Sequence, residues 1–466
     1  MVHRTTLVFV AIAIVVVVVV AGFLAYVELH PGGGGAHLGP VPVTNATCPT
    51  SNASSGNWTT YHANNVRSGV LGSGPVGAVT AGWSTSVDGQ VYAEPLVCGN
   101  AVYVATENDS VYALNLTTGA VLWRTNLGSP MPGSSLPCGD IDPSGITGTP
   151  VIDVASGTLY AVAYLTPGDH VLYGLNVRNG TVVSHVNVDP AGAAPLVEQQ
   201  RGALAFANGY VYVVYGGLDG DCGAYHGWVV GVPITASGGV VAYQVPTHRE
   251  GGIWGTAGMG VASDGNLYVA TGNGDSTTTF DHGDAVIELS PTLTELGYFA
   301  PANWAQLNRD DTDLGSVAPT VLPNGDVFEI GKAGVGYLLS GSDLGGIGGG
   351  ISNASICGGA YGATAHVGMT LFVPCTDGLT EVVANATNLT VGWQAPGFDA
   401  GSPIVTGNVV WSVNLTTGDL LGFNLSNGQL QFDVPLGSVD HFISPTAAPG
   451  RVVVGAGDRV VCVALT

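Results

Sequence analysis

The chain has 466 residues, and 33 Asp and Glu against 10 Lys and Arg give it a formal net charge of −23. Only 9% of its residues are charged, so the basic surface of a nucleic-acid-binding protein is excluded. Such a composition suits an acidic surrounding, where few ion pairs are lost as carboxylates protonate, or equally a neutral secreted surface. With 72 glycines, and no long stretch of helical period after residue 30, we expect many short strands joined by tight turns.

The N-terminus carries an uninterrupted apolar run over residues 7–27. At about 1.5 Å per residue, a helix of this length crosses a bilayer core of roughly 30 Å. Because Arg4 precedes the run and Glu28 follows it, we expect a cytoplasmic stretch over 1–6, a transmembrane signal anchor over 7–27 and export of the remainder. A cleaved signal peptide is the alternative, although its apolar part usually spans only about 7–15 residues. The sequence thus predicts a single-pass protein of the cell membrane.

Glycines 32–35 and nearby prolines indicate a flexible extracytoplasmic stalk over 28–80, followed by one folded domain over 81–466. Asn-X-Ser/Thr sequons support export and predict a glycoprotein. They lie at Asn45, Asn52, Asn57, Asn108, Asn115, Asn179, Asn353, Asn385, Asn388, Asn414 and Asn424.

The seven cysteines suit an oxidising compartment. Cys357 and Cys375 flank an expected hairpin and form the first candidate disulfide. Cys138 and Cys222 lie in irregular loops that a cross-link would restrain, and they form the second. The pairing of Cys48, Cys98 and Cys462 stays open, and the odd count leaves at least one unpaired within the chain. A metal site ranks lower, because no Cys-x-x-Cys or close Cys/His cluster occurs.

Residues 102–127 predict three consecutive short strands, and this pattern recurs in seven units along the chain. An eighth unit is split: residues 451–466 stop one strand short, and residues 82–87, which contain Trp83, resemble the missing strand. If the two ends pair, a ring of sheets closes and protects its edges. We therefore predict an all-β, eight-bladed β-propeller over 81–466. Seven blades is the alternative, since the unit at 310–350 is irregular.

The unit at 112–123, Tyr-Ala-Leu-Asn-Leu-Thr-Thr-Gly-Ala-Val-Leu-Trp, resembles the repeat of the pyrroloquinoline-quinone-like (PQQ-like) propellers. Stretches at 138–153, 225–228, 252–254 and 271–274 are similar to a secreted or membrane-anchored branch of that family. The resemblance implies that the Asn-x-x-Thr-Gly turn joins two strands and that the Trp packs between blades. The family includes quinoprotein dehydrogenases, assembly scaffolds without catalytic activity and many proteins without assigned activity.

In the dehydrogenases of this family, PQQ lies in the central funnel over a Ca²⁺ held by Glu, Asn and Asp. The resemblance assigns the Asn to Asn273 and the quinone-contacting lysine to Lys332, the only lysine of the chain. Trp228 and Trp254 are candidates for the funnel mouth, where Trp254 would contact the cofactor, and packing between blades is the alternative for both. No Glu stands at its expected place, where Asp221 or Asp219 substitutes as metal ligand. Asp281 and Asp284 are both candidates for the catalytic carboxylate. The adjacent-cysteine disulfide of the alcohol dehydrogenases is absent.

Other polar motifs have simpler explanations. Single histidines in loops are expected to stabilise turns or face solvent. The acidic run at 310–313 has the oxygen ligands of a cation site, but it lacks the pattern of a calcium-binding loop and is expected to be a capped or solvated turn.

The leading hypothesis is a membrane-anchored extracytoplasmic propeller that acts as a binding or scaffold module with a protein or glycan partner. The opposing hypothesis is a PQQ- and Ca²⁺-dependent dehydrogenase that oxidises an alcohol or sugar. A glycan-binding or surface-layer component is the third.

Overall fold

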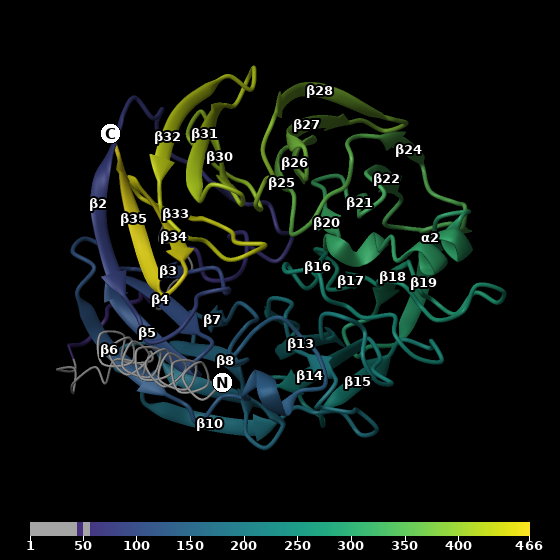
Figure 1. Cartoon of the computed structure of the whole chain (residues 1–466), viewed down its shortest axis with the longest axis horizontal. Helices are drawn as coiled ribbons and strands as arrows, with labels where there is room; N and C mark the ends of the chain where they lie inside the picture. Colours follow the sequence, from purple (N-terminus) through teal and green to yellow (C-terminus); the bar gives the residue numbers. More distant parts are fainter. Residues whose placement is uncertain (1–43, 50–55) are drawn as a thin grey trace, which may run out of the picture. The chain divides into compact units, whose positions relative to one another are not determined.

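The computed structural model describes residues 44–49 and 56–466, and its strands form eight separate sheets around a central axis (Figure 1). The predicted eight-bladed β-propeller is therefore confirmed, and the seven-bladed alternative is wrong. The irregular unit around 310–350 does form a blade of its own. Between its strands lies one two-residue strand, Gly346–Ile347, that pairs with the neighbouring sheet, which explains the irregular sequence pattern.

Each blade has four core strands that lie side by side, in order from the channel to the outside of the ring. Blade 1 consists of β3 (Leu96–Cys98), β4 (Ala101–Thr106), β5 (Ser110–Asn115) and β6 (Val121–Asn126), and blade 2 of β7 (Val151–Asp153), β8 (Thr158–Leu165), β9 (Asp169–Asn176) and β10 (Val182–Asn187). Blade 3 consists of β11 (Glu198–Gln199), β12 (Ala205–Ala207), β13 (Tyr210–Gly217), β14 (Trp228–Pro233) and β15 (Val241–Gln244). Blade 4 consists of β16 (Gly260–Val261), β17 (Leu267–Ala270), β18 (Val286–Leu289), β19 (Glu295–Ala300) and β23 (Gly346–Ile347).

Blades 5 to 8 follow the same plan. Blade 5 consists of β20 (Thr320–Val321), β21 (Val327–Ile330), β22 (Val335–Leu339) and β24 (Ser352–Ser355), and blade 6 of β25 (Ala365–Val367), β26 (Thr370–Cys375), β27 (Gly378–Ala384) and β28 (Leu389–Pro396). Blade 7 consists of β1 (Val70–Leu71), β29 (Ile404–Thr406), β30 (Val409–Asn414), β31 (Asp419–Asn424) and β32 (Leu430–Pro435). Blade 8 consists of β33 (Thr446–Ala448), β34 (Arg451–Ala456), β35 (Arg459–Leu465) and β2 (Val79–Ser86). One α-helix, α2 (Trp304–Asp310), and 3-10 turns at Gly133–Ser135 and Leu314–Ser316 lie between the strands that the structure describes.

The ring closes where the two ends of the folded chain meet. Strand β2 pairs antiparallel with β35, with Ser84 opposite Val461 and Val79 opposite Leu465. The N-terminal strand thus supplies the outer strand that the last blade lacks, as the sequence predicts (Figure 1).

A tryptophan on the outer strand of one blade contacts a turn of the next. Its indole N–H donates to a backbone carbonyl in three places: from Trp83 to Leu116 (3.0 Å), from Trp123 to Val177 (3.0 Å), and from Trp393 to Leu425 (3.2 Å). In each turn a glycine with positive φ lies under the indole, and a Cβ there would meet the ring at 2.4–2.7 Å; these are Gly119, Gly180 and Gly428. Only glycine combines this backbone conformation with this close approach.

Part of the segment expected to be a flexible stalk is folded into the ring. Trp58, Tyr61 and Arg67 are almost completely buried, and β1 pairs with the inner strand of blade 7. Tyr61 packs on the axis against four alanines that precede the inner strands of blades 3 to 6: Ala203, Ala257, Ala318 and Ala363. The stalk prediction for 28–80 therefore fails over residues 56–80, because buried aromatic and arginine side chains fix this stretch inside the channel.

Arg67 shows how this segment is held. Its Nε donates to Met259 O, its Nη1 to Thr60 Oγ1 and Tyr61 O, and its Nη2 to Leu204 O, at 2.8–3.3 Å. All three guanidinium nitrogens thus have partners, which compensates for the removal of a charge from water. Tyr61 of this segment also lines a small space that adjoins the cavity described below.

The structure pairs Cys138 with Cys222 and Cys357 with Cys375, the two pairs expected, and it also pairs Cys48 with Cys98. Cys462 is buried and unpaired. Three disulfides are typical of a protein outside the cytoplasm.

The segments 1–6 and 7–27 lie outside the described residues. Over 44–49 and 56–466, no helix has the length and apolar character needed to cross a bilayer. The membrane anchor and the use of the sequons stay predictions.

Buried carboxyls predict how stability depends on pH. Burial raises the pKa of Glu94 to about 8 and that of Glu107 to about 8, well above the value of about 4.3 expected in the unfolded chain. Between about pH 4.3 and about pH 8 the folded state binds more protons than the unfolded state. The free energy of unfolding therefore falls as pH rises through this range. Burial lowers the pKa of His62 to about 3, and this group costs stability only below about pH 6.5.

We expect the free energy of unfolding to increase as pH falls from 9 to 6.5, by on the order of 2 kcal/mol for each such carboxyl. The melting temperature should rise accordingly. Differential scanning calorimetry of Glu94→Gln should show a shallower pH dependence, since an amide cannot ionise. Asp343→Asn, which changes an exposed carboxylate, serves as the control. An unchanged slope in Glu94→Gln would contradict the assignment.

Candidate functional site

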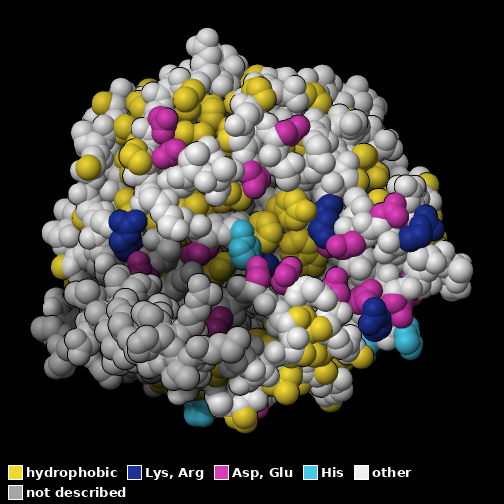
Figure 2. All heavy atoms as spheres, in the orientation of Figure 1, with side chains coloured by type: hydrophobic (Ala, Val, Ile, Leu, Met, Phe, Trp, Pro, Cys, Tyr) yellow, Lys and Arg dark blue, Asp and Glu magenta, His cyan; other side chains and the backbone are white. Residues whose placement is uncertain are grey.

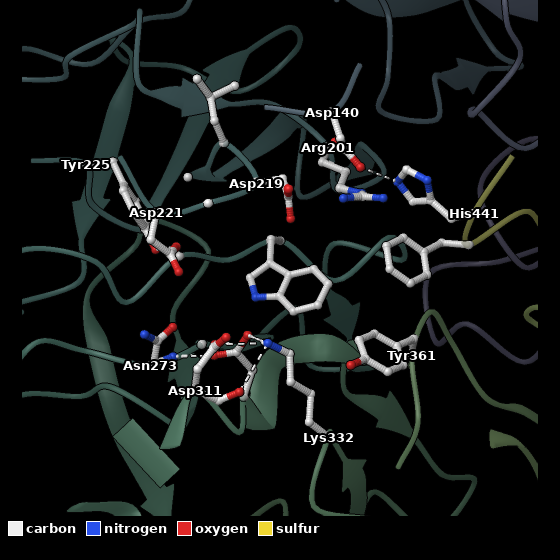
Figure 3. Close-up of a pocket in the computed structure, with 18 residues that line it drawn as sticks. Asp140, Arg201, Asp219, Asp221, Tyr225, Asn273, Asp311, Lys332, Tyr361 and His441 are labelled. Carbon is white, nitrogen blue, oxygen red and sulfur yellow. Dashed lines mark hydrogen bonds and ion pairs between the residues drawn. The ribbon is translucent and has the colours of Figure 1, made fainter. Parts of the chain in front are cut away.

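Loops from one end of the blades surround a cavity of about 430 Å³ on the ring axis (Figure 3). Figure 2 shows hydrophobic side chains at the centre of this face, bordered by acidic, basic and histidine side chains. The polar residues come from loops between strands, with Asp219 and Asp221 after β13, Asn273 after β17 and Lys332 after β21. Propeller loops of this kind meet at the axis although they are far apart in sequence.

Three aromatic rings form an apolar surface within the cavity. The ring centroid of Trp254 lies 6.3 Å from that of Tyr361 and 6.1 Å from that of Phe442, and Tyr361 stacks on Phe442 at 5.4 Å. Gly272 leaves room for the indole, because a Cβ there would come within 2.9 Å of Trp254 Nε1. Such a surface offers flat contact area to a small ligand.

Lys332 forms one charged wall together with two aspartates that follow α2. Its Nζ lies 2.8 Å from Asp313 Oδ2 and 3.0 Å from Asp311 Oδ1, and 5.6 Å from the Trp254 ring centroid. Asp313 Oδ1 accepts a hydrogen bond from the backbone N–H of Asn273 (2.7 Å). Burial opposes the charge of Lys332, but the carboxylates of Asp313 and Asp311 outweigh it and raise the pKa of the lysine. Burial raises the pKa of Asp313, although Lys332 favours its ionised form.

Arg201 lies on the opposite wall, in the loop after β11 (Figure 3). Its side chain is 9% exposed, and its Cζ lies 4.4 Å from the ring centroid of Phe442. Next to it, His441 Nε2 lies 3.5 Å from Asp140 Oδ2. Burial lowers the pKa of Arg201, while Asp140 and nearby acidic groups favour its charged form.

A disulfide joins two acidic loops at the mouth of the cavity. Cys138 and Cys222 are bonded to each other, which connects the loop of Asp140 to that of Asp219 and Asp221. Tyr225 donates to Asp221 Oδ1 at 2.5 Å and fixes that side chain. The bond restrains two loops that have no regular secondary structure.

The structure brings most of the candidate residues together. Asn273, Lys332, Trp254 and Asp221, with Asp219, all line the same cavity. Asp281 and Asp284, the two candidates for a catalytic carboxylate, do not line it. Asp284 is completely buried, and its Oδ1 accepts from the backbone N–H of Leu314 (2.8 Å), so it holds the loop behind the cavity. Asp281 accepts from the backbone N–H of Gly283 (3.4 Å).

Asp311 and Asp313 were expected in a capped or solvated turn, and the structure places them on the cavity wall instead. The sequence did contain a signal for these residues, namely the acidic run 310–313 and, 21 residues after Asp311, the only lysine of the chain. Arg201 carried no signal, since nothing in its local sequence separates it from other arginines. Trp228 does not line the cavity; it is buried in β14, where its indole donates to Glu198.

Replacing Lys332 by Met should destabilise the protein at pH 7, because Asp313 would keep a buried charge without a partner. We expect a loss of up to about 3 kcal/mol in unfolding free energy, which shrinks towards pH 4 as Asp313 takes up a proton. Chemical denaturation at both pH values measures this. Asp311→Asn, which removes the partner that is 62% exposed, should cost much less; an equal loss in both variants at both pH values would refute the account.

The comparisons with known proteins agree with the architecture. Residues 77–216 match the family described as outer membrane protein assembly factor BamB. No curated protein matches the sequence.

Three solved structures have a similar fold. The quinohemoprotein alcohol dehydrogenase of Comamonas testosteroni is 16% identical, with a TM-score of 0.67, covering 89% of this chain and 81% of its own. A europium-containing methanol dehydrogenase is 14% identical, with a TM-score of 0.68, covering 89% of this chain and 99% of its own. BamB from Moraxella catarrhalis is 13% identical, with a TM-score of 0.58, and the match covers 83% of this chain and 100% of BamB. Residues 77–216 therefore match the PQQ-like repeat family, and the described domain as a whole is an eight-bladed β-propeller.

Proposed function

We propose that this protein is an extracytoplasmic propeller that binds a small molecule in its axial cavity, held at the cell surface by the apolar segment 7–27. The observation that carries the proposal is a cavity of about 430 Å³ in which an aromatic surface meets convergent charged side chains. This volume and this combination of groups are typical of small-molecule sites. The disulfides support the compartment.

The cavity also has a closed end, which favours a ligand site over an open channel. Below the aromatic rings, Arg201, His441 and Phe442 also line a small inner space whose wall includes Tyr61. Tyr61 donates to Ser402 Oγ at 3.0 Å and belongs to the segment that fills the channel. A molecule that enters from the loop side therefore meets a floor. We place ligand binding ahead of a pure scaffold role for this reason.

A second candidate function is a quinoprotein dehydrogenase. The observation in its favour is that Asn273, Trp254 and Lys332 line one cavity, as the resemblance requires. The quinone would supply oxidation of an alcohol or sugar, and its cation would need carboxylate and amide oxygens.

Two of the cavity's carboxylates are already paired with a cation of the chain itself. The ammonium group of Lys332 is paired with both Asp311 and Asp313, which leaves one net negative charge among the three groups. Within 44–49 and 56–466, the one group of three His, Cys, Asp or Glu ligand atoms within 4.8 Å of one another is Cys357, Cys375 and Asp377, and those two cysteines form a disulfide. No three His, Cys, Asp or Glu ligand atoms among the described residues of the cavity come that close, so a cation there would need the amide oxygen of Asn273 beside the carboxylates.

The binding proposal predicts that ligands depend on Trp254. We expect thermal-shift measurements of the full-length protein against hexoses, sugar acids, amino acids, dicarboxylates and PQQ with Ca²⁺ to give at least one stabilising compound. Trp254→Ala should abolish that shift, because the ligand loses its aromatic contact. Trp304→Ala, in α2, is the matched control and should retain it. No stabilising compound, or a shift that survives in Trp254→Ala, would refute ligand binding in the cavity.

The dehydrogenase candidate predicts dye-linked oxidation of alcohols or sugars after addition of PQQ and Ca²⁺. Asn273→Ala and Lys332→Ala should each reduce this activity about tenfold or more, because each removes a polar group from the cavity wall. Absence of activity in the presence of bound PQQ would remove the enzyme and leave the binding module.

A further inference from the structure

Arg201 lacks the partners that a buried arginine normally has. Its Nη2 is fully enclosed and has no hydrogen-bond partner within 44–49 and 56–466, and the side chain is nine-tenths buried. Arg67 is also buried in the same channel, yet all of its guanidinium nitrogens donate to oxygen atoms. A buried charged donor without an acceptor costs free energy. The difference from Arg67 indicates that Arg201 is kept for a partner from outside the fold.

The Arg201 side chain lies at the boundary between two spaces of the channel, with its Nη2 enclosed. Arg201 lines both the axial cavity and the smaller space beneath it, and it stacks on Phe442 (Figure 3). Stacking fixes the plane of the guanidinium and leaves its edge for hydrogen bonds. A planar fork of donors matches the two oxygens of a carboxylate or of a phosphate. The deep end of the cavity therefore has the chemistry of an anion site.

The rest of the cavity limits the ligand to few negative charges. Asp140, Asp219, Asp221, Asp311 and Asp313 stand against the two cations Arg201 and Lys332, which gives the lining a formal charge of −3. Lys332 already has two carboxylate partners. A second or third anionic group on the ligand would face aspartates, which repel it. One anionic group, placed at Arg201, is the arrangement that avoids this repulsion.

The aspartates at the cavity mouth favour hydroxyl groups on the ligand. Asp219 is exposed there, and Asp221 uses one oxygen for Tyr225. Carboxylate oxygens accept hydrogen bonds strongly from hydroxyls. The aromatic rings of Trp254 and Tyr361 offer a flat apolar surface for the C–H face of a ring. Hydroxyls, one apolar face and one anionic group together describe an acidic sugar.

We infer that the axial cavity binds a monosaccharide with one anionic group, a carboxylate or a phosphate, and that Arg201 holds this group. The inference rests on the proposed function that the cavity binds a small molecule. It adds the class of ligand and names the residue that selects it.

Isothermal titration calorimetry of the full-length protein with D-glucuronate, glucose 6-phosphate and D-glucose tests the inference. At least one anionic sugar should bind about tenfold or more tightly than glucose, and the two anions distinguish a carboxylate from a phosphate. Arg201→Gln should reduce the affinity for that anion to the level of glucose. Arg178→Gln, at an exposed turn on the outside of the ring, should change nothing.

A stability measurement separates a ligand-binding role from a structural one. Without ligand, the melting temperature of Arg201→Gln should equal or exceed that of the wild type, because an enclosed donor without an acceptor is removed. A fall of several degrees would show that Arg201 holds the fold and would overturn the inference. Equal affinity for glucose and both anions, or no binding of any of the three, would also overturn it. The cavity proposal would survive these results if another compound still stabilised the wild type and not Trp254→Ala.

Discussion

At three junctions the angle between neighbouring blades is set by a contact between the outer tryptophan of one blade and a turn of the next. It combines a hydrogen bond from the indole, an apolar stack over a glycine, and in two cases a second hydrogen bond, from Thr85 to Gly119 and from Thr125 to Gly180 at 2.7 Å. Since each blade is an independent sheet, such contacts set the angle between neighbours. They fix the ring, and the ring fixes the loops that meet over the axis.

Other pairs of neighbouring blades use different side chains for this contact. Between blades 3 and 4 the contact is made by tyrosines: Tyr212 donates to Pro291 O and Tyr243 to Glu295 Oε2, both at 2.7 Å. After blade 4 the chain inserts α2 before it enters blade 5, and this insertion brings Asp311 and Asp313 towards Lys332. Local departures from a repeat are expected at functional sites, where the repeat's own geometry provides no suitable side chains.

The sequence predicted the fold well because the repeat is a local pattern. Trp83 and the truncated last unit were enough to predict ring closure, and the structure pairs β2 with β35 accordingly. Asn273 and Lys332 were placed in the funnel through motifs that lie on regular hairpins. Asp281 and Asp284 were candidates through the resemblance to the dehydrogenases, whereas the carboxylates that line the cavity here, Asp311 and Asp313, follow α2 further along the chain. The stalk prediction rested on composition, which does not show that residues around Trp58 fit the channel.

The chain has only 10 Lys and Arg, and three of them, Arg67, Arg201 and Lys332, lie in the channel or line the cavity. Arg67 makes four hydrogen bonds and holds the segment that fills the channel. Lys332 offsets two carboxylates that would otherwise repel each other at the mouth of the cavity. The folded chain itself thus supplies the partners of both Arg67 and Lys332. Arg201 has an aromatic ring beneath it and, among the described residues, an enclosed donor without an acceptor. In a chain with a formal charge of −23, many carboxylates were available to pair with it, so the missing partner is a property of the site and not of the composition.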